Sequence, residues 1–347
     1  MLGRFFKKER QGSPLLACDG RLPSDLWLDQ PDAEREIASR LSRGLLTEEQ
    51  AAKLRHFAER GYLTLSLGVP EWVFADIEQA VERLWREKPF EVAYAYHSLL
   101  KPFAFSDEAR ERRPSYRIAD LHSYSQGAYE LYLNPEIFSY VDLIWGQPAV
   151  ATQSLVFEYG SQQPLHRDPV HVHTYPPSHL AAAWVALENI GPYCGPLTYV
   201  PGSHRLPYYQ FSPGEYRLHQ GHHGEEDVAR ALEFDLRQCR QHGLEAETFT
   251  CKRGDVLIWH HSLLHGGSTP NDPSLTRKSF VVHFSTLANY KRLRQTFLEV
   301  VPDAAGSLVE RVRTFGTDRL LVRDGCHGFD NPLRGYRGAG APEEVAR

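Results

Sequence analysis

Six short segments decide the fold of this sequence: ATQSLVFEY (151–159), AAAWVALE (181–188), PLTYV (196–200), ETFTC (247–251), DVLIWH (255–260) and SFVVHFS (279–285). Each is apolar or alternates apolar and polar residues, and clusters of Gly, Pro and Asn separate them. Short runs rich in Val, Phe, Tyr and Trp are typical of strands in a β-sandwich or jelly roll. We therefore predict a mainly β fold with its strands between about residues 150 and 290.

Helical patterns come before this region. The segment TEEQAAKLRHFAER (47–60) places Thr47 and Gln50 in capping-box spacing, puts Leu54 and Phe57 on one face and ends at Gly61. Further patterns predict a strand at 62–67, a helix at 70–85 and a short helix starting at Pro135. We expect these N-terminal helices to pack their apolar stripes against the outside of the β core.

The chain has 347 residues, of which 41% are hydrophobic, an ordinary composition for a globular protein. We divide it into an N-terminal extension (1–44), a central domain (45–290) and a C-terminal extension and tail (291–347). The central domain consists of a helical part (45–149) and a jelly-roll core (150–290). Within the core, the polar, His-rich insertion at 205–243 contains one predicted helix, and we interpret it as a lid over the substrate.

Charge and cysteine usage exclude several classes of protein. The 39 Lys and Arg are balanced by 44 Asp and Glu, so no basic face is available and we expect no nucleic acid partner. Five cysteines without C-x-x-C spacing indicate reduced thiols and no zinc ribbon. The basic start MLGRFFKKER lacks the apolar region of a signal peptide, and no run reaches the ~18 apolar residues of a membrane helix. We expect a cytoplasmic protein that does not bind a membrane, and the oligomeric state stays open.

Two motifs, about a hundred residues apart, carry side chains suited to a metal. In QPLHRDPVHVH (163–173), His166 and Asp168 are two residues apart at the end of a predicted strand, so their side chains share a face. In RGDVLIWHHSLLHGGSTPN (253–271), His265 supplies a further imidazole. Two histidines and one carboxylate form the facial triad of non-heme Fe(II) oxygenases. Arg277 and Ser279 follow on the next strand, and a guanidinium with a hydroxyl suits a carboxylate ligand.

The abundance of histidine, 17 in all, leaves a competing arrangement open. A metal set of His166, His171 and His173 is conceivable, but it leaves the carboxylate and the distal imidazole without a role. We instead place His171, His173 and Tyr175 at the mouth of the site, in contact with substrate. Other histidines near these motifs are interpreted as spectators: His219, His222, His223, His260 and His261.

In combination, these motifs resemble the phytanoyl-CoA dioxygenase family of Fe(II)/2-oxoglutarate oxygenases. The resemblance rests on FAERGYLTL (57–65), the Q-x-x-H-x-D motif from Gln163 to Asp168, AWVALENI (183–190), GPLTYVPGSHR (195–205) and GD-x(9)-HGGS, with Arg277 downstream. Their order and spacing match over roughly residues 45 to 290. One departure is Cys194, where the family often has Asn before Gly-Pro-Leu, and we expect only a local change in that loop.

The resemblance implies a double-stranded β-helix (jelly roll, cupin-like) and an enzyme that uses Fe(II), the cosubstrate 2-oxoglutarate and O2 and releases succinate and CO2. It implies His166, Asp168 and His265 as the iron ligands and Arg277 as the partner of the distal carboxylate of 2-oxoglutarate. It also suggests further contacts in the cosubstrate pocket from Ser279, Trp184 and Gln163.

We expect hydroxylation of a small, polar metabolite or natural-product intermediate, because Tyr and His are frequent near the motifs and no basic cluster suits the phosphates of CoA. Tyr208 and Tyr209 of the insertion are predicted to contact this substrate. Two alternatives stay open. One is a cupin-type hydrolase or isomerase that uses zinc or manganese at the same residues, and the pair Arg277 and Ser279 argues against it. The other is a non-catalytic jelly-roll binding or sensing module, and the complete ligand set argues against that.

Overall fold

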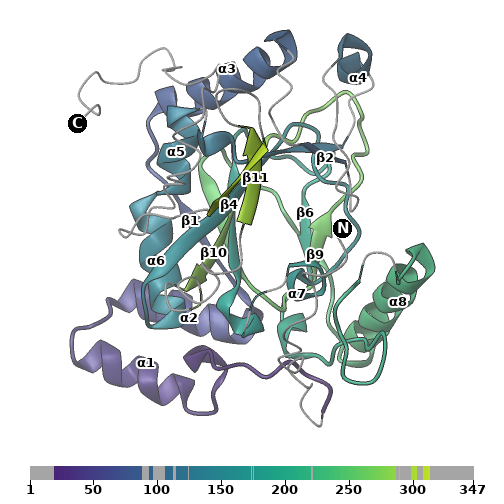
Figure 1. The fold of residues 1–347 in the computed structure, drawn as a ribbon. Coiled ribbons are helices and arrows are strands. Elements are labelled where there is room, and N and C mark those ends of the chain that lie inside the picture. Colours follow the sequence, from purple (N-terminus) through teal and green to yellow (C-terminus); the bar gives the residue numbers. More distant parts are fainter. Residues whose placement is uncertain are drawn as a thin grey trace.

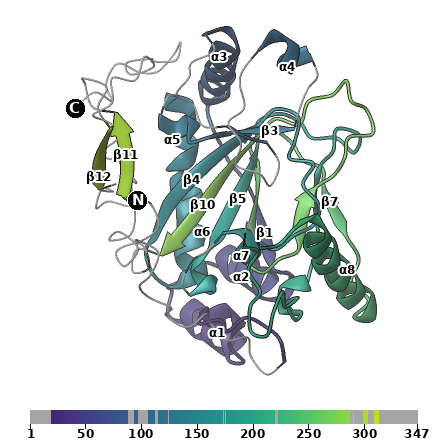
Figure 2. The same ribbon diagram turned by 45° about the vertical axis from the view of Figure 1, so that its right-hand side comes forward.

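The computed structural model describes residues 19–87, 106–111, 115–123, 125–172, 174, 176–219, 222–286 and 289, and the strands at 94–96, 298–302 and 308–312. Figures 1 and 2 show this part of the chain as coloured ribbon. The predicted substrate residues His173 and Tyr175 lie outside the described residues, as does the chain beyond residue 312. Among the described residues, no helix combines the length and the hydropathy that crossing a bilayer requires.

The helices of the described chain lie mostly before the main strands. They are η1 (Trp27–Asp29), α1 (Ala33–Ser42), α2 (Glu48–Arg60), α3 (Glu71–Glu87), α4 (Asp107–Glu111), η2 (Leu121–Ser123), α5 (Gln126–Tyr132), α6 (Pro135–Trp145), α7 (Asp168–His171), η3 (Pro177–His179), η4 (Ser203–Arg205) and α8 (Glu225–Gln241). The strands are β1 (Tyr62–Ser66), β2 (Tyr94–Tyr96), β3 (Tyr116–Ala119), β4 (Ala149–Phe157), β5 (Ala181–Ala186), β6 (Leu197–Tyr199), β7 (Glu247–Phe249), β8 (Asp255–His260), β9 (His265–Gly267), β10 (Ser279–Thr286), β11 (Leu298–Pro302) and β12 (Leu308–Val312).

Two antiparallel sheets organise the molecule. The larger sheet has seven strands in the order β1-β8-β5-β10-β4-β3-β2, and the smaller has three in the order β7-β6-β9. Strands β11 and β12 pair separately with each other. The helices α5 and α6 lie on one side of the larger sheet, and β6, β9 and α8 lie on the other (Figure 1). The predicted class of strands preceded by helices is therefore confirmed at this coarse level.

Alternation along the central strands separates two apolar cores. On β8, Val256 and Ile258 belong to the core beneath the helices, whereas Leu257 and Trp259 belong to the core between the sheets. The same alternation runs along β5 and β10. Since successive side chains of a strand point to opposite faces, each strand contributes to both cores. The second core also includes residues of β6, so the smaller sheet packs against the larger one.

The helix predicted at 47–60 is confirmed as α2. The Thr47 side chain accepts a hydrogen bond from the backbone of Gln50, whose side chain accepts one from the backbone of Thr47. The helix ends at Gly61 in the left-handed region, with a φ of 83°. The strand predicted next is β1, and the other two predicted helices are α3 and α6.

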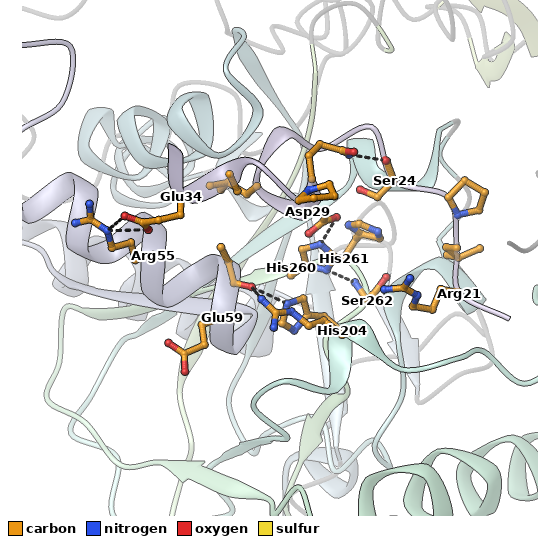
Figure 3. A pocket seen from close by; sticks show the side chains of 18 of the residues that line it. Arg21, Ser24, Asp29, Glu34, Arg55, Glu59, His204, His260, His261 and Ser262 are labelled. Atoms are coloured by element: carbon orange, nitrogen blue, oxygen red, sulfur yellow. Dashed lines mark hydrogen bonds and ion pairs between the residues drawn. The ribbon is translucent and has the colours of Figure 1, made fainter. Parts of the chain in front are cut away.

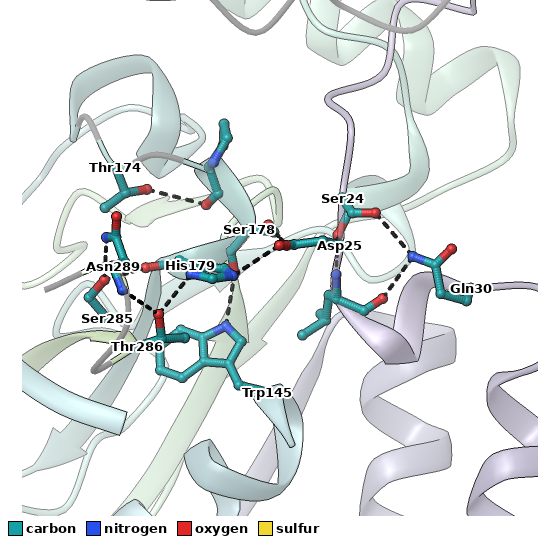
Figure 4. Close-up of polar contacts among 12 residues, drawn as sticks. Ser24, Asp25, Gln30, Trp145, Thr174, Ser178, His179, Ser285, Thr286 and Asn289 are labelled. Atoms are coloured by element: carbon teal, nitrogen blue, oxygen red, sulfur yellow. Dashed lines mark hydrogen bonds and ion pairs between the residues drawn. The ribbon is translucent and has the colours of Figure 1, made fainter. Parts of the chain in front are cut away.

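The segment before α2 contains structure that the sequence patterns did not indicate. Leu26, Leu28 and Ile37 of this segment join the same apolar core as α2 and α3. Asp25 also accepts hydrogen bonds from Ser178 and His179, as Figure 4 shows. Residues 24–37 are thus attached to the body of the molecule by apolar and polar contacts.

The insertion at 205–243 contains the one helix that was predicted for it, which is α8. Cys239 of this helix packs with Val200, Leu206 and Leu264 in a small apolar cluster. Leu165, which directly precedes His166, packs against the same cluster. The insertion is therefore attached to the segment that contains the H-x-D motif.

Candidate metal centre

Three of the predicted ligands converge in the structure. The Nε2 atoms of His166 and His265 lie 3.7 Å and 3.5 Å from the same Oδ1 of Asp168. One ligand atom of each residue lies within 4.8 Å of the others, and no other group of three His, Cys, Asp or Glu in the described residues is as compact. Two imidazoles and one carboxylate in this arrangement suit a divalent transition metal that keeps open positions.

The backbone reaches this arrangement differently from the expectation. The prediction that His166 and Asp168 end a strand is wrong, because β4 ends at Phe157 and Asp168 begins the short helix α7. His166 instead pairs with His265 through two backbone hydrogen bonds of 2.8 Å and 3.0 Å. Pro169 occupies the first turn of α7, where its fixed φ suits a helix start. This bridge brings together motifs about a hundred residues apart.

Hydrogen bonds orient each candidate ligand. The Nδ1 of His166 lies 2.9 Å from the carbonyl oxygen of Pro164, and the Nδ1 of His265 lies 2.9 Å from that of Leu263. A carbonyl oxygen can only accept, so each Nδ1 carries the proton and each Nε2 offers a lone pair. The other carboxylate oxygen of Asp168, Oδ2, accepts a hydrogen bond of 2.8 Å from the indole of Trp259. Such outer contacts fix ligand orientation in metal sites.

Electrostatics favour the protonation states that metal binding requires. Burial and the nearby His265 hold the pKa of His166 well below its ordinary value, so this imidazole is neutral at pH 7. Burial on its own would raise the pKa of Asp168, but the imidazoles of His265, His283 and His166 lower it overall. Neutral imidazole and ionised carboxylate are the forms that bind a metal.

Arg277 is a buried cation beside this cluster. Its Nη1 donates a 2.8 Å hydrogen bond to Ser279, and its Nε donates one of 3.2 Å to the carbonyl oxygen of Gly195. Only 2% of Arg277 is exposed, yet no carboxylate among the described residues forms an ion pair with it. Burial lowers the pKa of Arg277 to about 10, so the guanidinium stays charged at neutral pH. A buried charge without a partner indicates an anionic ligand.

Glycine makes room for this guanidinium. Gly160 has a φ of 74°, and a Cβ there would lie 2.9 Å from the Nε of Arg277. A Cβ at Gly267 would lie 3.1 Å from its Nη2. Both approaches are closer than ordinary van der Waals contact allows, so side chains at these positions would push Arg277 from its place.

A cavity of about 120 Å³ joins Arg277 to the three candidate ligands. Of the residues predicted around it, Gln163, Trp184 and His171 line the cavity, whereas Ser279 does not line it and contacts it only through its hydrogen bond with Arg277. Tyr208 and Tyr209 are not among the described residues that line it. Tyr208 is buried and donates a hydrogen bond to Ser262, and Tyr209 packs against the rings of Phe211 and Phe234.

Several lining residues were not found from the sequence: Arg117, Gln153, Trp259 and His283. For two of them a signal exists. His283 and Arg277 are six residues apart, so on one strand they share a face, and Trp259 is two residues from Leu257 on the inner face of β8. Arg117 and Gln153 offer no such signal, because the pairing of β3 with β4 that positions them depends on the tertiary fold.

The histidines interpreted as spectators near His265 face a second cavity. We call His204, His260, His261 and Asp29 the second histidine cluster; all four line a cavity of about 780 Å³ (Figure 3). The Nε2 of His260 bonds to Asp29 at 3.1 Å. None of these residues lines the cavity of the candidate metal centre.

Comparison with known proteins identifies the family of this chain. The family model of phytanoyl-CoA dioxygenase (PhyH) matches residues 57–279, which is well over half of the 347 residues. The chain belongs to the phytanoyl-CoA dioxygenase family. The peroxisomal phytanoyl-CoA dioxygenase of Mus musculus is 27% identical over 259 residues, covering 71% of this chain and 70% of the relative. The human enzyme is 26% identical with the same coverage.

Solved structures agree on the fold. The crystal structure of EctD from S. alaskensis with 2-oxoglutarate and 5-hydroxyectoine has a TM-score of 0.50 and 19% identity, covering 81% of this chain and 86% of that one. Membership of the phytanoyl-CoA dioxygenase family confirms the expectation of an Fe(II)- and 2-oxoglutarate-dependent oxygenase. Its cofactors are Fe(II), 2-oxoglutarate and O2, and its substrate is a small molecule.

Proposed function

We propose that this phytanoyl-CoA dioxygenase family member hydroxylates a small, polar metabolite, with His166, Asp168 and His265 holding Fe(II) and Arg277 binding the distal carboxylate of 2-oxoglutarate. The observation that carries this proposal is the position of Arg277, a buried and unpaired cation in the described chain that lines the same cavity as the His-Asp-His cluster. A dianionic cosubstrate that contacts both a metal and a guanidinium matches this combination.

The donor set fits ferrous iron. Two imidazoles and one carboxylate offer three ligand atoms within 4.8 Å of one another, and all three residues line the cavity, so together they would hold Fe(II) beside it. Bound there, Fe(II) would supply the oxidising chemistry that converts 2-oxoglutarate and O2 to succinate and CO2 while the substrate is hydroxylated.

The residues of the chain orient and shield this chemistry. The carbonyl oxygens of Pro164 and Leu263 hold both imidazoles in one tautomer, and Trp259 leaves only Oδ1 of Asp168 directed at the cluster. Ser279 fixes the guanidinium of Arg277. The rings of Trp184 and Phe157, with centroids 5.6 Å and 5.8 Å from that guanidinium, exclude water around it. Gln163 lines the same cavity and is proposed as a further cosubstrate contact.

The two facing antiparallel sheets support the double-stranded β-helix as the finer description of the fold. The candidate centre lies between them, with His265 on β9 of the smaller sheet and Arg277 just before β10 of the larger one. Ligand sites inside such a scaffold gain precision because rigid strands hold their side chains.

Polar residues support a polar substrate. His171, proposed here as a substrate contact, lines the cavity with Arg117, Gln153 and His283. The cavity wall therefore offers several hydrogen-bond donors and, with Arg277, two permanent cations. The buried Nδ1 of His283 has no hydrogen-bond partner in the described chain. An aliphatic substrate would leave this nitrogen unsatisfied, whereas a hydroxyl, amide or carboxylate group would satisfy it.

Turnover of 2-oxoglutarate tests the proposal. The purified chain is incubated with Fe(II), 2-oxoglutarate and ascorbate, alone and with a panel of polar metabolites, and succinate is measured. We expect Fe(II)-dependent succinate that a true substrate increases, and none from His265→Ala. Activity with zinc or manganese that does not consume 2-oxoglutarate would instead indicate the cupin-type hydrolase or isomerase. Failure to bind or turn over 2-oxoglutarate at all would contradict the proposal.

A further inference from the structure

Arg167 stands between two of the proposed iron ligands but points away from them. Its backbone is extended, with φ −115° and ψ 132°, so its side chain lies opposite to those of His166 and Asp168. Only 1% of Arg167 is exposed. A guanidinium is costly to bury, so its surroundings in the fold must compensate for the lost hydration.

The surroundings of Arg167 come from the insertion. Its Nη1 donates a 2.9 Å hydrogen bond to the carbonyl oxygen of Leu206, and its Nη2 forms an ion pair of 2.9 Å with Asp235 of α8. The guanidinium also lies 4.5 Å from the centroid of the Tyr208 ring. Asp235 is itself buried, with 7% exposed. The guanidinium of Arg167 is therefore surrounded by three groups of the insertion: a backbone carbonyl oxygen, an aromatic ring and a carboxylate.

The same cluster reaches the segment that carries the third proposed ligand. Tyr208 donates a 2.8 Å hydrogen bond to Ser262, which lies three residues before His265. Leu264 packs with Leu206 and Cys239 of the insertion. Side chains next to both residues of the bridge between His166 and His265 are therefore in contact with the insertion.

We propose that Arg167 and Asp235 are positioning residues, which anchor the H-x-D segment to α8 and thereby hold His166 and Asp168 at the distance from His265 that a metal requires. The inference rests on the proposed function, since it gives the insertion at 205–243 a role in holding the proposed iron ligands in place. Neither residue lines the metal cavity, so both act only through the backbone of the ligands.

The chemistry of the pair explains why an arginine is used. The planar guanidinium donates a hydrogen bond to the Leu206 carbonyl oxygen through Nη1 and at the same time forms an ion pair with the Asp235 carboxylate through Nη2, whereas a lysine offers one flexible point charge. Removing one partner of a buried pair leaves an uncompensated charge, but replacing both by apolar residues of similar size often preserves stability. A variant pair can therefore separate positioning from folding.

Cobalt binding to the metal-free protein tests this inference. Co(II) is titrated into the full chain and its visible absorption is recorded, because the band shape reports ligand geometry. The variants are Arg167→Lys, Asp235→Asn and the double variant Arg167→Met with Asp235→Leu. Glu226→Gln on the same helix is the matched control, since its side chain is 91% exposed and pairs with Arg230 at 3.7 Å. A thermal melt of each metal-free variant monitors folding.

We expect each of the three variants to lose about 10- to 100-fold in Co(II) affinity, the range for groups that hold ligands in place, with an altered absorption band. The control and the wild type should match. Wild-type affinity and spectrum in the folded double variant would overturn the inference, even if the single variants are unstable, because packing alone would then suffice. Failure of the wild type itself to bind Co(II) would overturn the proposed function as well.

Discussion

The candidate metal centre and the second histidine cluster contain the same residue types a few positions apart. His265 belongs to the first, whereas His260 and His261, five and four residues earlier, belong to the second. Each cluster combines imidazoles with one aspartate, Asp168 in the first and Asp29 in the second, and all of these imidazoles are buried except the half-buried His166. Only the first brings three ligand atoms within 4.8 Å of one another in the described chain.

The direction of the imidazole lone pairs separates the two. In the metal centre, the backbone carbonyl oxygens of Pro164 and Leu263 accept hydrogen bonds from the Nδ1–H groups, and both Nε2 atoms face Asp168. In the second cluster, Nε2 of His260 already bonds Asp29, and its Nδ1 accepts a 3.0 Å hydrogen bond from the backbone of Ser262. His260 thus has both nitrogens engaged within the protein. Composition does not distinguish a metal site from a structural cluster, but the hydrogen bonds of each nitrogen do.

The largest expected effect follows from removing a ligand. His265→Ala should abolish turnover and weaken Fe(II) or Co(II) binding by more than the roughly 10- to 100-fold typical of supporting groups. His166→Ala and Asp168→Ala should do the same. His261→Ala, four residues away, should leave metal affinity near the wild-type value, because that side chain faces the other cavity.

Metal titration of the four variants provides the measurement. Full metal affinity in His265→Ala, or a loss of affinity confined to His261→Ala, would contradict the assignment of metal binding to the cluster that contains His265.

Removal of the unpaired cation should act on the cosubstrate alone. Arg277→Met should weaken 2-oxoglutarate binding by about 2–5 kcal/mol, the range for truncating one member of a buried charge pair. Metal affinity should stay nearly intact, and the metal-free protein should not lose stability, since a buried charge without an acidic partner in the described chain is removed. A 2-oxoglutarate titration at fixed Fe(II) and a thermal melt give both quantities. An unchanged titration curve would exclude Arg277 as the carboxylate partner.

The local elements were largely predictable from the sequence because their signals are local. The capping box at Thr47, the left-handed Gly61 and the alternation in segments such as DVLIWH depend on neighbouring residues only. The small helix α7 was missed, since the sequence favoured a strand through His166 and Asp168. The structure of the chain before α2 was missed as well, because its contacts, such as that of Asp25 with His179, join residues 154 positions apart.

The ligand residues of the candidate centre were predictable from the sequence, but the contacts that hold those ligands in place were not. The spacing of His166 and Asp168 and the position of His265 indicated a metal, and the structure brings the three together. The hydrogen bond from Trp259 and the burial of Arg167 were not predictable, because each depends on which strand or helix packs nearby.

The second histidine cluster should matter for stability and not for turnover. Asp29→Asn should lower the free energy of unfolding at pH 7 by about 1.5–3 kcal/mol, the value of a hydrogen bond to a charged group. Burial would raise the pKa of Asp29, but His260 and His261 lower it overall, so the folded state favours the ionised form. That stabilisation is present above the ordinary pKa of an aspartate, about 4, and is lost as the pH falls further.

The stability gap between wild type and Asp29→Asn should therefore shrink as the pH falls below about 4. Urea unfolding at pH 7 and at decreasing pH measures this gap, and succinate formation at pH 7 should be the same for both proteins. A marked loss of turnover in a folded Asp29→Asn protein would give the second cluster a role in the reaction.

The smallest effect should come from the indole that orients Asp168. Trp259→Phe keeps the ring in the core between the sheets but removes the 2.8 Å hydrogen bond to Oδ2. The freed carboxylate can then rotate, so metal affinity should fall by about tenfold, the lower end for supporting groups. Trp145→Phe is the matched control, because Trp145 is also buried and donates a 2.9 Å hydrogen bond, but to the carbonyl oxygen of Ser178 (Figure 4). Neither Trp145 nor Ser178 lines the cavity of the candidate metal centre. If hydrogen bonds to the ligands are what distinguish the two clusters, Co(II) titration will show the loss in Trp259→Phe alone. Equal affinities in both variants would show that packing is sufficient to orient Asp168, and the distinction between the clusters would then rest on the imidazoles.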